Sequence, residues 1–274
     1  AERLLAGIDR LGQYSLYYSL NDGAFRFGSE ASGALGPAAG KTSLKKQGLY
    51  NYVYFHMVPS PGTVYQTVQK LPAAHMLELG ANDKCSVSNY WLPQFSAASR
   101  EKNFSTLAEE LKEVLRESVK SSIPSEGKTG AFLSGGLDSS TVTGVMSEVH
   151  KGQGEAFAIG FSADGYDEMA FARISARHFD VKLNEYYVTP QDVVDALPMI
   201  ATSYEEPFGN SSALPAYFCA RMAAQNNVTT LLAGDGGDEI FAGNERYLRQ
   251  KVFDNYSLAP RAIRQGIIEP LVNA

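Results

Sequence analysis

The chain has 274 residues, a length that at about 150 residues per domain favours two domains. Its composition, with 44% hydrophobic and 20% charged residues, is that of a globular protein. It contains neither an apolar run of about 18 residues nor a signal-peptide pattern, so we expect neither a membrane nor a secreted protein. With 24 Lys and Arg against 30 Asp and Glu, the net charge of −6 excludes general electrostatic binding to nucleic acid.

The two cysteines are Cys85 and Cys219, which lie far apart in the sequence. They form neither a metal-binding spacing nor a disulfide framework, a pattern that fits the reducing cytoplasm, where we expect the protein to be located. Because a free cysteine behaves as a small hydrophobic residue, we predict that both pack against apolar neighbours. The four histidines show no ligand spacing, and we assign them no role.

The first third of the sequence, up to about Leu92, predicts short strands separated by turns, because it is rich in aromatic and β-branched residues. Asn21-Asp22-Gly23 and Pro59-Ser60-Pro61-Gly62 are its clearest turn signals. One helix is expected at 43–56. The strands are expected at 3–8, 14–20, 25–29, 75–79 and 85–91.

A polar stretch at 93–103 follows, and we place the domain linker there, between domains at 1–100 and 104–274. Beyond it helices and strands alternate, with Ser105 as the candidate N-cap of the first helix, which runs to about Val119. Such alternation implies right-handed crossovers and an α/β fold, with a parallel sheet covered by helices on both faces. Further strands are expected at 129–134, 155–161, 184–189 and 228–234, and helices at 142–149, 167–179, 190–203 and 214–225.

A glycine-rich turn, SGGLDSS at 134–140, joins a buried strand to the helix that follows. It lies at the carboxyl edge of the predicted parallel sheet, where open α/β folds bind ligands. Gly135 and Gly136 let a ligand approach the main chain, and the N–H groups at the start of the next helix point outward. Such a turn suits an anion such as a pyrophosphate, although a tight strand-to-helix turn without a ligand is the simpler alternative.

Asp138 stands within this turn, and its carboxylate would repel a phosphate group at about 4 Å by about 4 kcal/mol at an effective dielectric constant near 20. Mg²⁺ removes the conflict, because it is commonly held by one or two carboxylates together with phosphate oxygens. We therefore interpret Asp138 as a metal ligand. The turn lacks the lysine of the Walker A pattern, so it is not an ordinary P-loop.

A second glycine-rich turn, AGDGGDEIF at 233–241, follows the last predicted strand and carries Asp235, Asp238 and Glu239. Acidic residues at the start of a helix can simply complement its dipole. Two acidic turns at the same sheet edge, however, can hold one metal-bound nucleotide between them. We therefore predict a site that both turns share.

Together the two turns resemble the synthetase domain of the asparagine synthase (glutamine-hydrolysing) family, whose ATP pyrophosphatase fold carries the signature S-G-G-(L/I/V)-D-S-S. The early half resembles the later part of the family's class II glutamine amidotransferase domain, in the segments AGIDRLGQYSLYYS, FGSEASGAL and VPSPGTVYQTVQKLPAAHML. The resemblance covers essentially the whole chain. It implies an adenine nucleotide alpha hydrolase-like parallel sheet, preceded by a mostly-β α+β region that is part of an Ntn amidotransferase domain.

The resemblance implies a reaction in which ATP adenylates the side-chain carboxylate of aspartate, pyrophosphate leaves, and ammonia derived from glutamine displaces AMP to give asparagine. It gives Asp138 and Asp238 the role of Mg²⁺ ligands and Asp235 that of a catalytic base, where many family members have Glu. It is also compatible with a homodimer of the full-length protein. The residues that it implies for ATP are Ser134, Gly135, Gly136, Leu137, Asp138, Ser139 and Ser140 at the pyrophosphate, and Leu133, Ile159 and Gly234 around the adenosine.

Glu205 and Glu206, followed by Pro207, resemble the family's D-E-P segment near the substrate pocket. A loop exposed to solvent is an equally good interpretation of these two residues.

The sequence departs from the family at its two ends. The family's glutaminase uses an N-terminal cysteine nucleophile, whereas this sequence begins at Ala1, inside the matching domain. It ends at Ala274, before the later helices that bring a catalytic basic residue to the adenylate. We therefore expect an internal fragment of a longer enzyme, which does not hydrolyse glutamine and does not complete amide synthesis.

Two alternatives remain open. A β-lactam synthetase or another biosynthetic amide ligase on the same fold would share the nucleotide turns and differ in the acceptor pocket. A non-catalytic nucleotide-binding module belongs to a different class of protein. Asp138 and Asp238 argue against such a module, because carboxylates beside phosphates are unfavourable without a metal.

Overall fold

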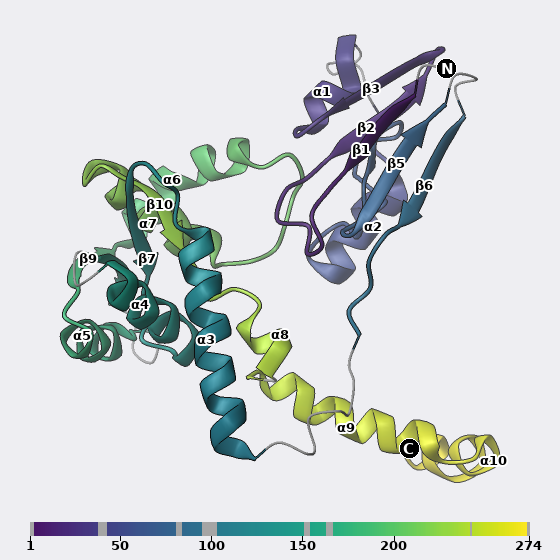
Figure 1. Ribbon diagram of the computed structural model, residues 1–274. Coiled ribbons are helices and arrows are strands. Elements are labelled where there is room, and N and C mark those ends of the chain that lie inside the picture. The colour runs from purple at the N-terminus through teal and green to yellow at the C-terminus, as the bar shows by residue number, and fades with distance from the viewer. Residues whose placement is uncertain are drawn as a thin grey trace. The chain divides into compact units, whose positions relative to one another are not determined.

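The computed structural model describes residues 3–37, 43–80, 84–94, 103–150, 154–162, 167–241 and 243–272. The chain forms two compact units (Figure 1). The first unit consists of residues 1–104 and 189–217, and the second of residues 105–188 and 218–274. Among the described residues, each helix is too short or too polar to cross a lipid bilayer.

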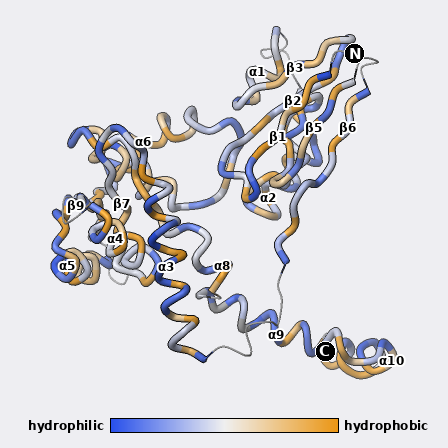
Figure 2. Tube along the Cα trace, in the orientation of Figure 1, coloured by the Kyte–Doolittle hydropathy of each residue, from blue (hydrophilic) through white to orange (hydrophobic). Residues whose placement is uncertain are grey.

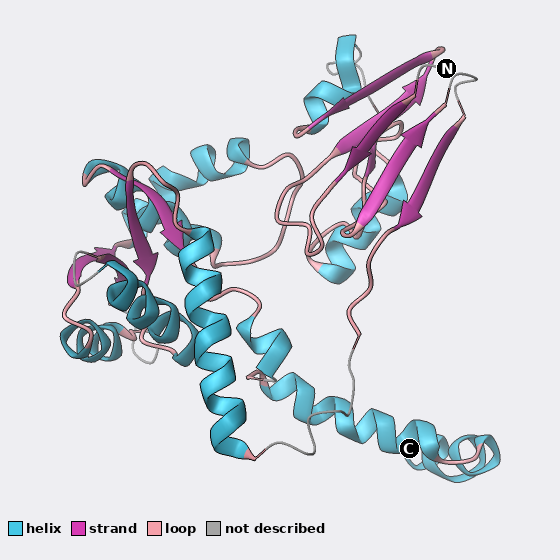
Figure 3. Ribbon diagram, viewed as in Figure 1, coloured by secondary structure: helices cyan, strands magenta, loops and turns pink. Residues whose placement is uncertain are grey.

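The first unit contains two antiparallel sheets of three strands each (Figure 3). Its clearest turn joins β2 to β3, where Asp22 and Gly23 have φ angles of 53° and 69°. Positive φ at both central residues is typical of a two-residue hairpin, so the turn predicted at this position is confirmed. The strand orders are β1 (Leu4–Gly7), β5 (His75–Leu79), β6 (Cys85–Asn89) and β3 (Ala24–Gly28), β2 (Tyr17–Asn21), β4 (Gln69–Lys70).

Among its described residues, four helices contribute to the first unit. The sequence predicts α2, Lys46–Phe55, which ends where His56 adopts a left-handed conformation with a φ of 61°. It does not predict α1, Ala31–Leu35, which packs closely on β3. Helix α6, Pro190–Ser203, and the first residues of α7, Ala213–Gln225, complete the unit. Its buried side chains include Tyr17, Ala31, Ala34, Leu35 and Val68 around α1, and Tyr18, Leu71 and Leu77 in a second cluster.

The second unit is built on a four-stranded sheet in the order β10-β7-β8-β9, and every neighbouring pair is parallel. The predicted parallel sheet is therefore confirmed. Its strands are β7 (Lys128–Phe132), β8 (Glu155–Phe161), β9 (Lys182–Val188) and β10 (Val228–Leu232). Its helices are α3 (Phe104–Ser122), α4 (Leu137–His150), α5 (Met169–His178), most of α7, α8 (Gly237–Phe241), α9 (Glu245–Leu258), α10 (Arg261–Ile263) and α11 (Glu269–Val272), with a π-helix at Arg264–Ile268.

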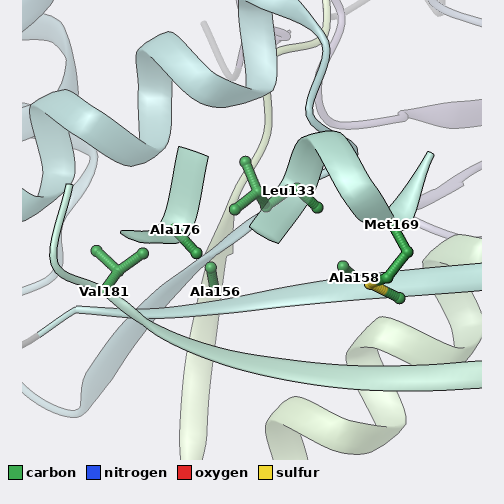
Figure 4. Packing of buried hydrophobic residues seen from close by; sticks show 7 residues of the cluster. Leu133, Ala156, Ala158, Met169, Ala176 and Val181 are labelled. Atoms are coloured by element: carbon green, nitrogen blue, oxygen red, sulfur yellow. The ribbon is translucent and has the colours of Figure 1, made fainter. Parts of the chain in front are cut away.

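Helices cover both faces of this sheet. Successive residues of a strand point to opposite sides, so the neighbours of adjacent residues in β8 show which helix covers each face. Ala156 and Ala158 of β8 pack with α5 on one face (Figure 4). Phe157, between them in sequence, packs on the other face with Cys219 and Met222 of α7. Helix α3 carries hydrophobic and hydrophilic residues along its length (Figure 2), and its Val119 joins a cluster with β7, α4 and β10.

Two further predictions from the sequence have a clear outcome. Cys219 is buried with 3% exposure and Cys85 packs against the second cluster of the first unit, so both are packing residues as predicted. Ser105 is not an N-cap, because α3 begins one residue earlier, at Phe104. Of the predicted linker at 93–103, residues 95–102 lie outside the described part of the chain.

Candidate functional site

The first glycine-rich turn continues directly from β7. The N–H of Leu133 donates to the carbonyl of Phe157 on β8 at 2.9 Å, so the chain still pairs with β8 one residue beyond β7. Gly135 then takes a φ of 89°, and a Cβ there would lie 2.5 Å from the backbone nitrogen of Ala172 on α5. Only glycine meets both conditions. The turn is thus fixed between β7 and the start of α5, and α4 begins at Leu137.

Hydrogen bonds among its own serines hold the turn in shape. The hydroxyls of Ser134 and Ser139 lie 3.1 Å apart, and the N–H of Gly136 donates to the Ser134 hydroxyl at 3.2 Å. The hydroxyl of Ser140 instead lies 2.9 Å from that of Ser175 on α5. Ser134 and Ser139 therefore face the turn, whereas Ser140 links α4 to α5.

The second glycine-rich turn follows β10, which pairs directly with β7. Gly236 has a φ of 90°, and the N–H of Gly237 donates to the carbonyl of Gly234 at 3.2 Å. Helix α8 begins at Gly237. Because β7 and β10 are adjacent and parallel, both turns leave the same carboxyl edge of the sheet.

The two turns are in contact at that edge. A Cβ on Gly234 would lie 2.9 Å from the Cβ of Asp138, and one on Gly237 would lie 2.5 Å from the Asp138 carboxyl carbon. Glycine at both positions gives the Asp138 side chain its space. The carboxylate of Asp238, the next residue, contacts Gly243, and Asp235 is exposed. The structure thus brings Asp138 against the turn that carries Asp235 and Asp238.

The donor set at this edge fits Mg²⁺ bound together with a polyphosphate. Within the described residues, His, Cys, Asp and Glu form no group of three or more that could hold a metal by itself. Mg²⁺ does not need such a cage, because it is usually held by one or two carboxylates, phosphate oxygens and water. Asp138 and Asp238 offer two carboxylates on neighbouring turns.

The remaining predicted nucleotide residues differ in exposure. Leu133 is 1% exposed and belongs to the core, so its side chain serves packing. Leu137 is 82% exposed at the start of α4. Ile159 lies toward the carboxyl end of β8 and packs beside Phe157. The roles of these residues toward ATP stay predictions.

Tyr247 on α9 is a neighbour of the second turn that is not among the predicted site residues. Loss of solvent together with the nearby carboxylates of Glu239 and Asp238 raises the pKa of its hydroxyl, which hydrogen-bonds to Glu239. Its position ten residues after Gly237, the third glycine of the turn, was the available sequence signal, but that spacing alone assigns no partner.

Glu205 and Glu206 belong to the first unit, whereas both glycine-rich turns belong to the second. The carboxylate of Glu206 accepts from Lys70 at 2.7 Å and has only 8% exposure. Glu205 accepts from the N–H of Ala31 at 2.9 Å. A solvent-exposed loop is therefore the wrong interpretation of these two residues.

A parallel sheet with helices on both faces and two glycine-rich turns at its carboxyl edge define the second unit as an open α/β fold. Residues 110–273 match the asparagine synthase family, and residues 1–91 match the glutamine amidotransferase domain. The first match alone covers more than half of the chain. The chain belongs to the asparagine synthase family, and its early antiparallel region corresponds to part of a glutamine amidotransferase domain.

Two relatives illustrate the match. "Putative asparagine synthetase 2 (glutamine-hydrolyzing)" of Methanocaldococcus jannaschii is 35% identical over 262 residues, which are 93% of this chain and 50% of that protein. Asparagine synthetase 1 (glutamine-hydrolyzing) of Bacillus subtilis is 26% identical over 95% of this chain and 40% of its own length. The chain thus spans half or less of the length of these relatives.

Among solved structures, the NH3-dependent NAD synthetase of Campylobacter jejuni in complex with the nitrate ion is similar over 63% of this chain and 85% of that one. The two share 15% sequence identity, with a TM-score of 0.33. A TM-score this low supports no statement about function.

Proposed function

We propose that this chain belongs to an ATP- and Mg²⁺-dependent amide ligase that converts aspartate to asparagine with ammonia derived from glutamine. The observation that carries the proposal is the contact of Asp138 with Gly234 and Gly237, which joins two acidic, glycine-rich turns at one sheet edge. Family membership supplies the reaction class. In this proposal residues 1–100 are the later part of an amidotransferase-like domain and residues 104–274 the ATP-binding domain, and the homodimer of the longer protein stays a prediction.

The first turn would bind the phosphates. The N–H groups of Gly135 and of the first residues of α4 are suited to an anion, whereas that of Gly136 already donates to the Ser134 hydroxyl. Helix α4 is long enough, at 14 residues, to have a dipole. The hydroxyls of Ser134 and Ser139 face the same turn and add donors. Leu133, Ile159 and Gly234 would border the adenosine. Of the predicted set, Ser140 has the weakest support, because its hydroxyl is engaged by Ser175.

Asp138 and Asp238 would hold Mg²⁺, and a bound Mg²⁺ supplies charge stabilisation on the leaving pyrophosphate. In the first step, an oxygen of the aspartate side chain forms a bond to the α-phosphorus while the bond to pyrophosphate breaks. In the second, the nitrogen of ammonia bonds to the activated carbon and the bond to AMP breaks. Asp235 is exposed beside the turn, and we assign it the proton that the nitrogen loses.

The proposal is tested by exchange of labelled pyrophosphate into ATP in the presence of a panel of carboxylic acids. Aspartate alone is expected to support exchange, and Asp138→Asn is expected to reduce its rate by about a hundredfold or more. Asp254→Asn, on the exposed face of α9, is the matched control and should retain the rate. Exchange with a different acid would favour a β-lactam synthetase or another amide ligase. Mg-ATP binding without exchange for any acid would favour a non-catalytic module.

A further inference from the structure

The segment 204–214, which joins α6 to α7 and includes the first two residues of α7, is bound to the rest of the first unit at several points. Its Glu205 and Glu206 carboxylates contact separate parts of that unit, and its backbone adds two further hydrogen bonds. These contacts come from β2, from α1, from the C-cap of α2 and from residues 63–70. They are Ala31 N–H to Glu205 (2.9 Å), Tyr65 hydroxyl to the Glu205 carbonyl (2.9 Å), Val64 N–H to Glu206 (3.1 Å), Lys70 to Glu206 (2.7 Å), Tyr17 hydroxyl to Glu206 (3.4 Å) and Gly209 N–H to the His56 carbonyl (2.7 Å).

Lys70 and Glu206 form a largely buried ion pair. The two side chains are 17% and 8% exposed. One oxygen of Glu206 accepts from Lys70 and Tyr17 and the other from the N–H of Val64, so both oxygens are satisfied. The pKa of the Tyr17 hydroxyl is raised by burial and by the charge of Glu206, as expected for a phenol that donates to a buried carboxylate.

A buried ion pair holds together the two segments that carry its partners, because separating or removing one partner is strongly unfavourable. If either charge is removed, the other stays largely buried without its opposite charge, which is less favourable than removing both. The segment can leave the first unit only by exposing or unpairing both charges. Lys70 and Glu206 therefore act as a clamp on residues 204–214.

The clamped segment forms one wall of a cavity of about 600 Å³ in the first unit. Opposite walls come from Leu49 of α2, Val64 and Tyr65, and from α6. Glu206 itself borders the cavity, so loss of the clamp would change the cavity's shape. The same segment runs into α7, whose later residues pack under β8 in the second unit.

We propose that Glu206 is a positioning residue that, through Lys70, fixes residues 204–214 and with them the cavity wall and the start of α7.

The clamp is tested by amide hydrogen exchange on the whole chain. In Glu206→Gln and in Lys70→Met, residues 204–214 are expected to exchange about tenfold faster or more, while β7 and β8 exchange as before. In the double variant no charge is left unpaired, so its increase is expected to be smaller than the product of the two single increases. Unchanged exchange at 204–214, or single effects that simply multiply, overturns the clamp.

Lys112 and Glu109 on α3 provide the matched control, since they form an ion pair of the same 2.7 Å length that is exposed. Glu109→Gln and Lys112→Met should leave exchange at 204–214 unchanged. Should the charge variants not fold, Tyr17→Phe removes the hydrogen bond from the Tyr17 hydroxyl to the Glu206 carboxylate. It is expected to raise exchange at 204–214 by about twofold to fivefold, and no increase would overturn the clamp.

Discussion

Asp138 lies against the backbone of the second glycine-rich turn, and this contact limits which residues can stand at position 237. A carboxylate and a side chain cannot share the space, since a Cβ on Gly237 would lie 2.5 Å from the Asp138 carboxyl carbon. Gly237 thus leaves space for the Asp138 carboxylate of the first turn, in addition to its role in the second turn.

For Gly237→Ala we expect the Asp138 carboxylate to be displaced and the affinity for Mg-ATP to fall by about tenfold or more, because a shifted metal ligand loses its geometry. The melting temperature without nucleotide should change little, since α8 has no buried residues. Calorimetric titration with Mg-ATP measures the effect. Gly266→Ala is the control, because a Cβ there meets open space, and equal affinities of the two variants would contradict the expectation.

Cys219 gives a prediction that depends on pH. Burial raises the pKa of its thiol from about 9 to about 12. At pH 8 iodoacetamide should therefore modify Cys219 in the folded chain far more slowly than in urea, because the thiolate is the nucleophile. Mass spectrometry of the labelled peptide measures both rates, and similar rates would contradict it.

The same pKa shift has a consequence for stability. An acid whose pKa is raised in the folded state favours folding fully below its unfolded pKa, near 9. That contribution is lost as the pH rises from about 9 to about 12. The urea midpoint should fall over this range, and should fall less in Cys219→Ala.

At the residue scale, the sequence was sufficient to predict features that depend on residues close together in the chain. Glycine, serine and aspartate within seven positions predicted the first turn, and the structure brings Asp138 to the second turn as the shared-site hypothesis requires. The partner of Glu206 was not predictable in this way, because Lys70 lies 136 residues earlier. The partner of the Ser140 hydroxyl, Ser175, was not predictable either, because this contact depends on how α5 packs against α4.

At the scale of elements, periodicity placed most helices and strands of the second unit, because each is long enough to show a repeat. Strand β8 and helix α6 have the predicted bounds. The sequence missed α1, with five residues, and β4, with two, because such short elements are stabilised by packing rather than by their own pattern. Helices α9 to α11 were not predicted either.

Helix α6 begins with a capping box that supports a prediction of its own. The Thr189 hydroxyl accepts from the Asp192 N–H at 3.2 Å, and the Asp192 carboxylate accepts from the Thr189 N–H at 2.8 Å. Thr189→Ala should lower the free energy of unfolding by about 1 kcal/mol, because it removes one of these bonds.

Urea denaturation of the whole chain measures this loss. Gln191→Ala, two residues further along the exposed start of the helix, is the control and should change the free energy of unfolding by less than about 0.5 kcal/mol. A Thr189→Ala variant as stable as the original chain would show that the box adds nothing to α6.

At the scale of the whole molecule, the first unit is discontinuous in sequence. Residues 189–217 belong with residues 1–104, although the strands on either side of them, β9 and β10, are in the second unit. No composition change marks this excursion, and the contacts that define it join residues more than a hundred positions apart. For this reason the sequence indicates two domains but not the path of the chain between them.

We expect a fragment of residues 1–104 to be less stable than the same fragment joined to 189–217 by a flexible linker. Without the added segment, Lys70 loses its partner and the cavity loses one wall. Thermal melts followed by circular dichroism compare the two fragments. A joined fragment carrying Glu206→Gln is the control and should melt between them. Identical melting of the short and joined fragments would contradict the expectation.

The excursion of residues 189–217 also restricts how relatives can be recombined. A chimera with a single crossover near residue 104 would pair Lys70 from one parent with Glu206 from the other, in surroundings that were never selected together. Keeping each unit from one parent requires two more junctions, near residues 188 and 218. The second of these falls inside α7, so a successful exchange must also splice one helix from two sequences.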